Sequence, residues 1–113
     1  MADLVAIARQ HLDLARSGDN GRSAELLVHD GVLRQSVIAL TRGSELGEHN
    51  SPHAASLQVL VGSVEVTGQP ATVVDAGSLV ELTHERHAVT AREDSVFLLT
   101  TVTGLEPEQV ARG

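Results

Sequence analysis

Two glycine-bounded stretches decide the fold of this chain: GSELGEHNSPHAASLQVLVG at residues 43–62 and GSLVELTHERH at residues 77–87. In each stretch a glycine precedes a short run typical of a β-strand, and a histidine follows that run, His49 in the first and His87 in the second. Gly62 closes the first stretch as a hairpin glycine. The two stretches therefore predict short strands joined by tight turns.

The same pattern of short apolar runs and turn residues extends over most of the chain. Glycine, proline, asparagine and aspartate separate runs rich in valine, threonine and leucine, and no long helical pattern lies between the runs. An alternating parallel βαβ sheet is therefore excluded, and a β-sandwich or barrel is predicted. The predicted strands are Ala24–His29, Val32–Thr41, Glu45–His49, Ser56–Val61, Ser63–Thr67, Thr72–Val74, Ser78–Leu82, Ala88–Ala91 and Ser95–Thr103.

One helix is predicted before the strands, over residues Asp3–Ser17, because apolar residues recur there at three- and four-residue intervals. Asp3 places a carboxylate at the first N–H groups, Arg16 places a cation near the last carbonyls, and Gly18 ends the helix. A helix this short is not stable alone, so its apolar face has to cover an open barrel end, an outer sheet face or a partner subunit. No linker or repeat divides the chain, which predicts one domain over residues 1–113, with the helix at 3–17 and the barrel at 24–103.

Charge and composition exclude several classes of partner. The 113 residues include eight arginines, no lysine and fifteen carboxylates, which gives a net charge of -7. The arginines are scattered and Phe97 is the one aromatic residue, so we expect neither nucleic-acid binding nor attachment to a membrane surface. No apolar run reaches the roughly 20 residues that span a bilayer. The N-terminus has no signal-peptide pattern, so a cytoplasmic protein is expected.

Several catalytic motifs are absent from the sequence. There is no cysteine, no Gly-x-Ser-x-Gly elbow and no glycine-rich phosphate loop. Disulfides, thiol chemistry, serine hydrolysis and nucleotide binding therefore have no support. The remaining candidates for catalysis or metal binding are the six histidines, four of which lie in the two stretches quoted above.

The two stretches resemble the two sequence motifs of the cupin superfamily. In the first motif Gly43, His49 and Gly62 match in spacing. Ser51 stands at the position of the second motif histidine, and Ala55 stands at the position of the glutamate. The fold part of the motif is therefore present, and half of its metal-binding part is replaced.

The second motif is matched less closely. Gly77 fits, Thr83 replaces a proline, Glu85 replaces a glycine, and His87 arrives one residue early. A turn shortened by one residue could still place His87 at the position of the motif histidine. The resemblance covers residues 32–103 and is greatest to the small single-domain members of the superfamily.

This resemblance implies an all-β fold: a cupin-like double-stranded β-helix, or jelly-roll barrel, with one N-terminal α-helix. Cupins often hold a divalent metal inside the barrel, and small cupins commonly dimerise. For this chain the resemblance implies a divalent metal ion (Mn, Fe, Ni, Zn or Cu) on His49, His53 and His87. It also implies a small organic ligand beside the metal, and a homodimer.

The spacing of the histidines bears on whether they can share one ion. Two residues of the same strand face, as in His-x-His, lie about 6.6 Å apart, which lets both nitrogens reach one ion at ~2.1 Å. His49 and His53 would lie about 13 Å apart in a straight strand, so they share an ion only if residues 50–52, which include a proline, bend the chain. Gln58 or Glu48 could supply an oxygen, although Glu48 faces away from His49 in a regular strand.

Two residues are candidates for binding a substrate, and several have a structural alternative. Gln58 and Arg86 are the substrate-binding candidates, Arg86 because a guanidinium beside His87 could bind a carboxylate. Arg86 could equally face solvent in its turn. The structural alternatives for the other side chains are an exposed loop for His53, a solvated turn for His84, a packed or interface position for His11 and an exposed hairpin end for His29.

Two hypotheses of function follow, from different classes. The first is a metal-binding cupin of oxygenase or isomerase type that acts on or binds a small organic molecule. The alternative is a metal-free binding or sensor cupin without catalytic activity, which Ser51 and Ala55 favour. A third hypothesis, sugar or keto-acid isomerisation with His49 or His87 as the base, lacks the aromatic residues that often assist in sugar sites.

Overall fold

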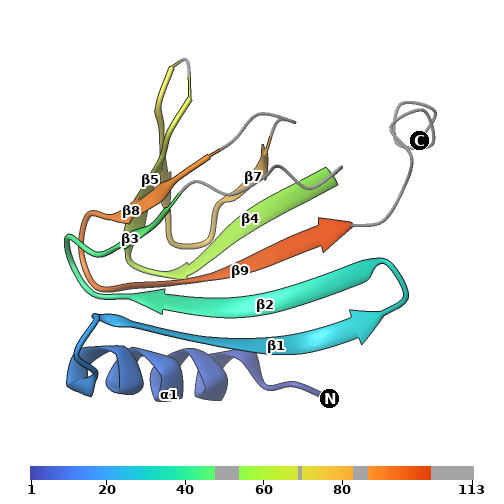
Figure 1. The fold of residues 1–113 in the computed structure, drawn as a ribbon, viewed down its shortest axis with the longest axis horizontal. Coiled ribbons are helices and arrows are strands. Elements are labelled where there is room, and N and C mark those ends of the chain that lie inside the picture. Colours follow the sequence, from blue (N-terminus) through green and yellow to red (C-terminus); the bar gives the residue numbers. More distant parts are fainter. Residues whose placement is uncertain (48–53, 69, 83–86, 103–113) are drawn as a thin grey trace.

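The computed structural model describes residues 1–47, 54–68, 70–82 and 87–102 and has two antiparallel sheets with one helix against the larger sheet (Figure 1). The five-stranded sheet has the order β1-β2-β9-β4-β7, and the four-stranded sheet has the order β3-β8-β5-β6. The predicted helix is confirmed, and each of the nine predicted strands coincides with an observed strand, although residues 48, 49 and 103 of the predicted strands lie outside the described ranges. The elements are α1 Leu4–Ser17, β1 Arg22–Asp30, β2 Leu33–Leu40, β3 Glu45–Leu46, β4 Ala54–Val61, β5 Ser63–Val66, β6 Thr72–Asp75, β7 Leu79–Leu82, β8 Val89–Ala91 and β9 Ser95–Val102.

The core fills the space between the two sheets, because alternate residues of every strand point inward. The sheets do not close into a complete barrel, but their arrangement is consistent with a jelly roll. Phe97 is the largest fully buried side chain, and aliphatic residues from both sheets surround it. The buried members of this core are Ile38, Leu40, Leu57, Val59, Val64, Val66, Val74, Val89, Ala91 and Phe97.

The helix covers the outer face of the five-stranded sheet. The sequence allowed an open barrel end, an outer sheet face or a partner subunit, and the structure shows the second of these. Its buried residues Ala8, Leu12 and Ala15 form a second cluster with outward-facing residues of β2 and β9, including Val37 and Val96. Asp3 begins the helix as predicted, since its Oδ1 accepts hydrogen bonds from the backbone N–H groups of the second and third helical residues at 3.1 and 3.2 Å.

Polar contacts fix the helix in this position. His11 is 5% exposed, and its Nδ1 lies 2.7 Å from Ser23 Oγ while its Nε2 lies 2.8 Å from Glu25 Oε1. At the other end of the helix, Arg16 Nε donates to Asp94 Oδ2 at 2.8 Å. The prediction that His11 is a packed residue is therefore confirmed.

The motif glycines occupy backbone conformations that other residues rarely adopt. Gly43, Gly62 and Gly77 all have positive φ, between 82° and 88°. Gly62 also lies against the β8–β9 turn, where a Cβ atom would collide with the Asp94 carbonyl and with Ser95. The spacing of these glycines therefore marks real turns of the fold.

The two sheets are joined at one end and lie apart at the other. At the joined end, Ser95 Oγ of β9 accepts from Ser63 N of β5 at 2.9 Å and lies 3.0 Å from the Ser63 carbonyl oxygen. At the far end, β4 begins and β7 and β9 finish (Figure 1). We call this far end the rim. Within the part of the chain that the structure describes, no helix is long and apolar enough to cross a membrane.

Candidate ligand site at the rim

His87 is the one predicted metal ligand that falls within the described ranges. His49 and His53 lie outside them, as does Arg86, one of the two predicted substrate-binding residues. The structure therefore places one imidazole and leaves the predicted three-histidine set untested.

His87 lies two residues before β8 and next to the end of β5, and its side chain is half-buried. A Cβ atom built on Gly68 would lie 3.9 Å from His87 Cε1, which places the ring against a residue without a side chain. The ring therefore lies beside the residues that follow β5.

Thr67 contacts the ring of His87 and the backbone of the next residue. His87 Nδ1 donates a hydrogen bond to the Thr67 carbonyl oxygen at 2.6 Å, and Thr67 Oγ1 accepts from Ala88 N at 2.8 Å. Because a carbonyl can only accept, Nδ1 carries the proton. Many histidines that bind a metal through Nε2 are oriented by such a bond from Nδ1 to a carbonyl.

The register places Ala55 where the first motif has its glutamate, on the inward face. Ala55 pairs with Thr101 on one side and with Leu82 on the other, and the next inward residue of its strand is the fully buried Leu57. A glutamate at this position would point between the sheets. In this chain the position carries a methyl group, so it offers no donor to a metal.

Gln58 does not face the interior. It lies between Leu57 and Val59, which both point into the core, so its side chain belongs to the outer face of the five-stranded sheet. The predicted substrate-binding role at the barrel interior is therefore not supported. The physical reason is the alternation of side chains along a strand: Ala55 lies on the inward face, and Gln58, three residues later, lies on the opposite face.

One transverse row of side chains runs across the five-stranded sheet at the rim. His29 pairs with Arg34, Arg34 with Thr101, Thr101 with Ala55, and Ala55 with Leu82. We call these five residues the rim row. Arg34 Nη2 donates to His29 Nε2 at 3.0 Å, which shows that these two partners share a face. Two apolar rows lie deeper, with Ser36 as their one polar residue: Ser36, Leu99, Leu57 and Val80, then Ile38, Phe97 and Val59.

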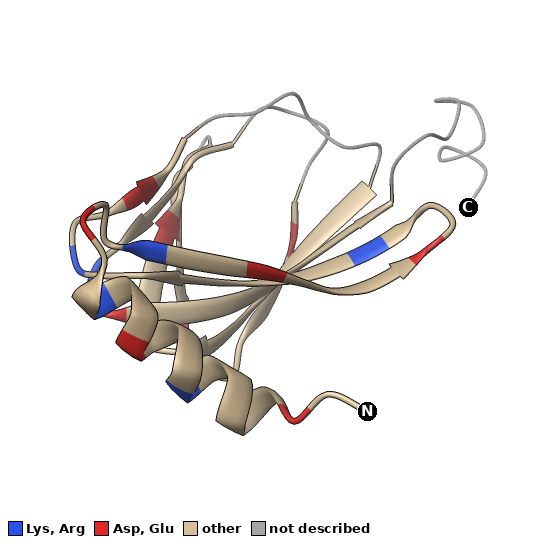
Figure 2. Ribbon diagram, turned by 60° about the horizontal axis from the view of Figure 1, so that its bottom comes forward, with Lys and Arg blue, Asp and Glu red and all other residues tan. Residues whose placement is uncertain are grey.

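Charge is sorted between the two faces of the described strands. Every aspartate and glutamate of those strands lies on an outward face by register, whereas Arg34 lies on the same face as the core residues Ile38 and Leu40. His29, its partner, is exposed, as predicted for the end of a hairpin. Figure 2 shows the acidic and basic residues spread along the helix and the strands. The six outward carboxylates are Glu25, Asp30, Glu45, Glu65, Asp75 and Glu81.

Sequence reasoning did not single out Arg34 and Thr101, which the structure places in the rim row. The face on which Arg34 lies could be predicted from the sequence, because Ile38 and Leu40 are four and six residues further along the same strand and therefore share its face. The pairing with Thr101 could not, because no local pattern indicates which distant strands are neighbours.

The described residues supply one of the donors that a metal ion needs. Within the described ranges, no group of three or more histidine, aspartate or glutamate side chains could hold a metal. His87 fits the role by its position and orientation, and Ala55 does not. Any complete donor set therefore depends on residues such as His49 and His53.

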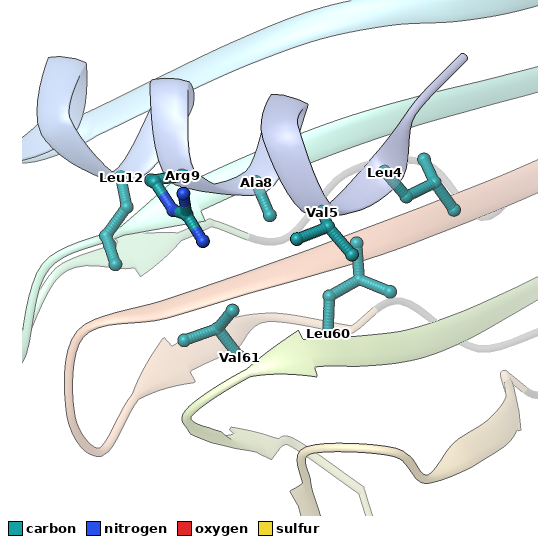
Figure 3. Close-up of a pocket in the computed structure, with 7 residues that line it drawn as sticks. All are labelled: Leu4, Val5, Ala8, Arg9, Leu12, Leu60 and Val61. Atoms are coloured by element: carbon teal, nitrogen blue, oxygen red, sulfur yellow. The ribbon is translucent and has the colours of Figure 1, made fainter. Parts of the chain in front are cut away.

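A separate groove lies outside the barrel, between α1 and the end of β4 (Figure 3). Its volume is about 360 Å³, and Arg9 is the one charged residue that lines it. The other lining residues are apolar: Leu4, Val5, Ala8, Leu12, Leu60 and Val61. Because it lies behind the five-stranded sheet, the groove does not communicate with the core face that carries the rim row.

Comparison with known proteins supports the fold. No family model matches the chain, and no curated protein does. A conserved protein of unknown function from Streptococcus pyogenes is 27% identical with a TM-score of 0.69, over 79% of this chain and 80% of that one. A cupin superfamily protein from Desulfitobacterium hafniense is 14% identical with a TM-score of 0.71, over 82% and 87%.

An enzyme is also among the similar structures. An acetylacetone dioxygenase from Acinetobacter johnsonii is 19% identical with a TM-score of 0.66, over 74% of this chain and 61% of that one. Two antiparallel sheets with turn glycines at the motif positions, together with these similar structures, define the RmlC-like cupin fold. This chain has that fold, with one helix before the first strand.

Proposed function

We propose that this protein binds a small organic molecule at the rim, beside a divalent metal ion held by His49, His53 and His87. The observation that carries the proposal is the hydrogen bond from His87 Nδ1–H to the Thr67 carbonyl, a bond of the kind that orients many metal-binding histidines. The spacing of His49 within the first stretch supports the same site. When bound, the metal would supply Lewis-acid or oxygen-activating chemistry.

Elemental analysis tests the metal site directly. Protein purified without a nickel column is expected to contain close to one equivalent of Mn, Fe, Ni, Zn or Cu. His87→Ala and His49→Ala are expected to lose that metal and keep the fold, and His53→Ala to weaken its retention. His84→Ala, in the same second stretch, is the matched control and is expected to keep the metal. Metal content that is unchanged in His87→Ala contradicts the proposal.

The second candidate function is metal-free binding of a small molecule. Ala55 favours it, because the inward position of the motif glutamate carries no donor. A metal bound to the folded state raises the melting temperature by mass action, so a chelator lowers the melting temperature of a metal-binding protein. An unchanged melting temperature after chelator treatment and dialysis supports the metal-free candidate instead.

We further propose that the protein is a cytoplasmic homodimer. The apolar side chains that stand exposed on the single chain support this assembly, including Val5 at 71% and Leu79 at 67% exposure. Sedimentation at micromolar concentration tests it, and a monomer under those conditions contradicts the proposal.

A further inference from the structure

We propose that the groove between α1 and the end of β4 binds a free aliphatic monocarboxylic acid. Arg9 is the counter-ion of the carboxylate, and the apolar walls of the groove surround the carbon chain. The groove lies behind the five-stranded sheet, so this site is separate from the metal site that we propose at the rim (Figure 3). The inference therefore goes beyond the proposed function and does not depend on it.

The size and lining of the groove are those of a small-molecule site. Its volume of about 360 Å³ lies near the lower end of the range of about 300–1,000 Å³ that is usual for such sites. An apolar lining with one charged group is also their usual composition, because the polar group orients the ligand. The lining of α1 extends from Leu4 to Leu12, about 12 Å along the helix axis at ~1.5 Å per residue. This volume spread over this length suits an unbranched chain better than a ring system.

A β-bulge gives the groove its sheet wall. The register between β4 and β9 shifts between Val59 and Val61, which leaves Leu60 as the extra residue of the bulge. Val61 pairs with Val96, which packs beneath the helix, so Val61 lies on the same outer face of the sheet. Leu60 packs against the same cluster beneath the helix. Two consecutive side chains therefore face α1, whereas regular alternation would turn one of them into the core.

Arg9 is the charged residue of the groove, and it has no partner among the described residues. It forms no hydrogen bond and no ion pair with that part of the chain, whereas Arg16 of the same helix forms ion pairs with Asp13 and Asp94. Figure 3 shows its guanidinium extending from α1 into the space between the helix and β4. A guanidinium presents its N–H groups in a planar fork that matches the two oxygens of a carboxylate. Arg9 is therefore available to an anionic ligand.

The carboxylates on and beside the helix are engaged elsewhere. Asp3 accepts hydrogen bonds from the first N–H groups of α1, Asp13 lies beside Arg16, and Glu25 lies beside His11. The net charge of -7 repels phosphates, dicarboxylates and anionic membrane surfaces more strongly than it repels a monoanion. One unpaired guanidinium beside an apolar channel therefore favours a free acid with a single carboxylate.

Calorimetric titration with octanoate, hexanoate and octanamide tests the inference. Octanoate is expected to bind wild-type protein about tenfold or more tightly than octanamide, because the amide lacks the charge-assisted bonds to Arg9. Hexanoate is expected to bind about tenfold more weakly than octanoate, since each buried methylene group contributes roughly three- to fourfold. Added salt is expected to weaken the binding of the two acids and not that of the amide.

Removal of the guanidinium tests the role of Arg9. Arg9→Gln is expected to lose about tenfold or more in affinity for octanoate and to leave the affinity for octanamide unchanged. Arg22→Gln is the matched control, because it removes the same charge from an exposed position of β1 that does not line the groove. This control is expected to leave both affinities unchanged.

Val5→Glu tests the site with Arg9 still in place. Val5 is 71% exposed and lies one helical turn before Arg9, so a glutamate there can pair with the guanidinium in place of the ligand. This variant is expected to lose about tenfold or more in affinity for octanoate. Gln10→Glu adds the same charge at an exposed position outside the lining, and it is expected to change that affinity only slightly.

Several outcomes overturn the inference. They are equal binding of octanoate and octanamide, no binding of octanoate at millimolar concentration, equal effects of Arg9→Gln and Arg22→Gln, and equal effects of Val5→Glu and Gln10→Glu. Octanoate that converts a dimer into monomers in a sedimentation experiment also overturns it, because the groove then belongs to the contact between two copies of the chain.

The metal analysis separates this inference from the proposed function. Arg9→Gln is expected to keep the metal content of the wild type, because the groove lies behind the sheet. Octanoate binding that depends on Arg9 in a protein without metal supports the inference and contradicts the metal site. Metal in the wild type without any binding of octanoate supports the metal site and overturns the inference.

Discussion

Asp94 shows how one side chain ties the helix to the sheet. Hydrogen bonds from Arg16 and from the backbone N–H of Arg42 hold the pKa of this carboxyl below its ordinary value. A carboxyl with a lowered pKa in the folded state stabilises the fold above its unfolded pKa of about 4. That contribution is lost as the pH falls through the folded-state value.

Asp94→Asn is therefore expected to lower the free energy of unfolding by about 1 kcal/mol at pH 7. The difference from wild type is expected to shrink as the pH falls from about 4, where the unfolded chain becomes protonated at this residue, through the lower pKa of the folded state. Thermal melts at pH 7 and pH 3 measure both effects. Asp13→Asn is the control, because Asp13 is 74% exposed and lies 3.9 Å from the same arginine. Equal effects of the two variants would contradict the assignment.

Gly62 and Gly77 illustrate two different reasons why a position requires glycine: the backbone conformation and the lack of space for a Cβ atom. Both have positive φ, but a Cβ on Gly62 would collide with the backbone of the β8–β9 turn, whereas nothing lies within 4 Å of one on Gly77. Gly77→Ala is expected to cost about 1 kcal/mol for the backbone conformation alone. Gly62→Ala is expected to cost several kcal/mol, because the turn has to move. Denaturant titration of both variants measures the two costs.

At the scale of an element, the contacts of His11 hold α1 on the sheet. His11 is buried and contacts Ser23 and Glu25 on the edge strand β1, so it anchors the helix where the sheet is least supported. His11→Ala is expected to cost about 2 kcal/mol and to increase amide exchange in β1. Gln10→Ala, at an exposed position of the same helix, is expected to change neither quantity. Faster exchange in β1 without loss of stability would mean that the contact is local only.

The elements were predictable from the sequence because glycines, prolines and alternating residues mark them locally. The helix was predicted, but its position was not, since an apolar face does not say which surface it covers. The candidate site was less predictable. The role given to Gln58 ignored the parity of its strand, and the rim row joins residues of β1, β2, β9, β4 and β7 that are neighbours only through the topology.

At the scale of the whole molecule, Phe97 is the side chain on which both sheets converge. It is fully buried among residues of both sheets and is the one aromatic ring of the chain. Phe97→Ala is expected to cost about 3–5 kcal/mol, a large part of the stability of a domain of this size. Both sheets are expected to lose their structure together in a denaturant titration, and Val73→Ala, at an exposed position, is expected to change little. Separate transitions for the two sheets would contradict a shared core.

The joint at Ser95 also determines where the molecule can move. Hydrogen bonds between Ser95 and Ser63 clamp the sheets at one end, whereas at the rim no comparable bond between the sheets is found among the described residues. We therefore expect the backbone near Ser95 to open less often than the backbone at the rim. Amide exchange is therefore expected to quicken progressively along β4 and β9 with distance from Ser95. A ligand would then enter by widening the free edge, without unfolding the core.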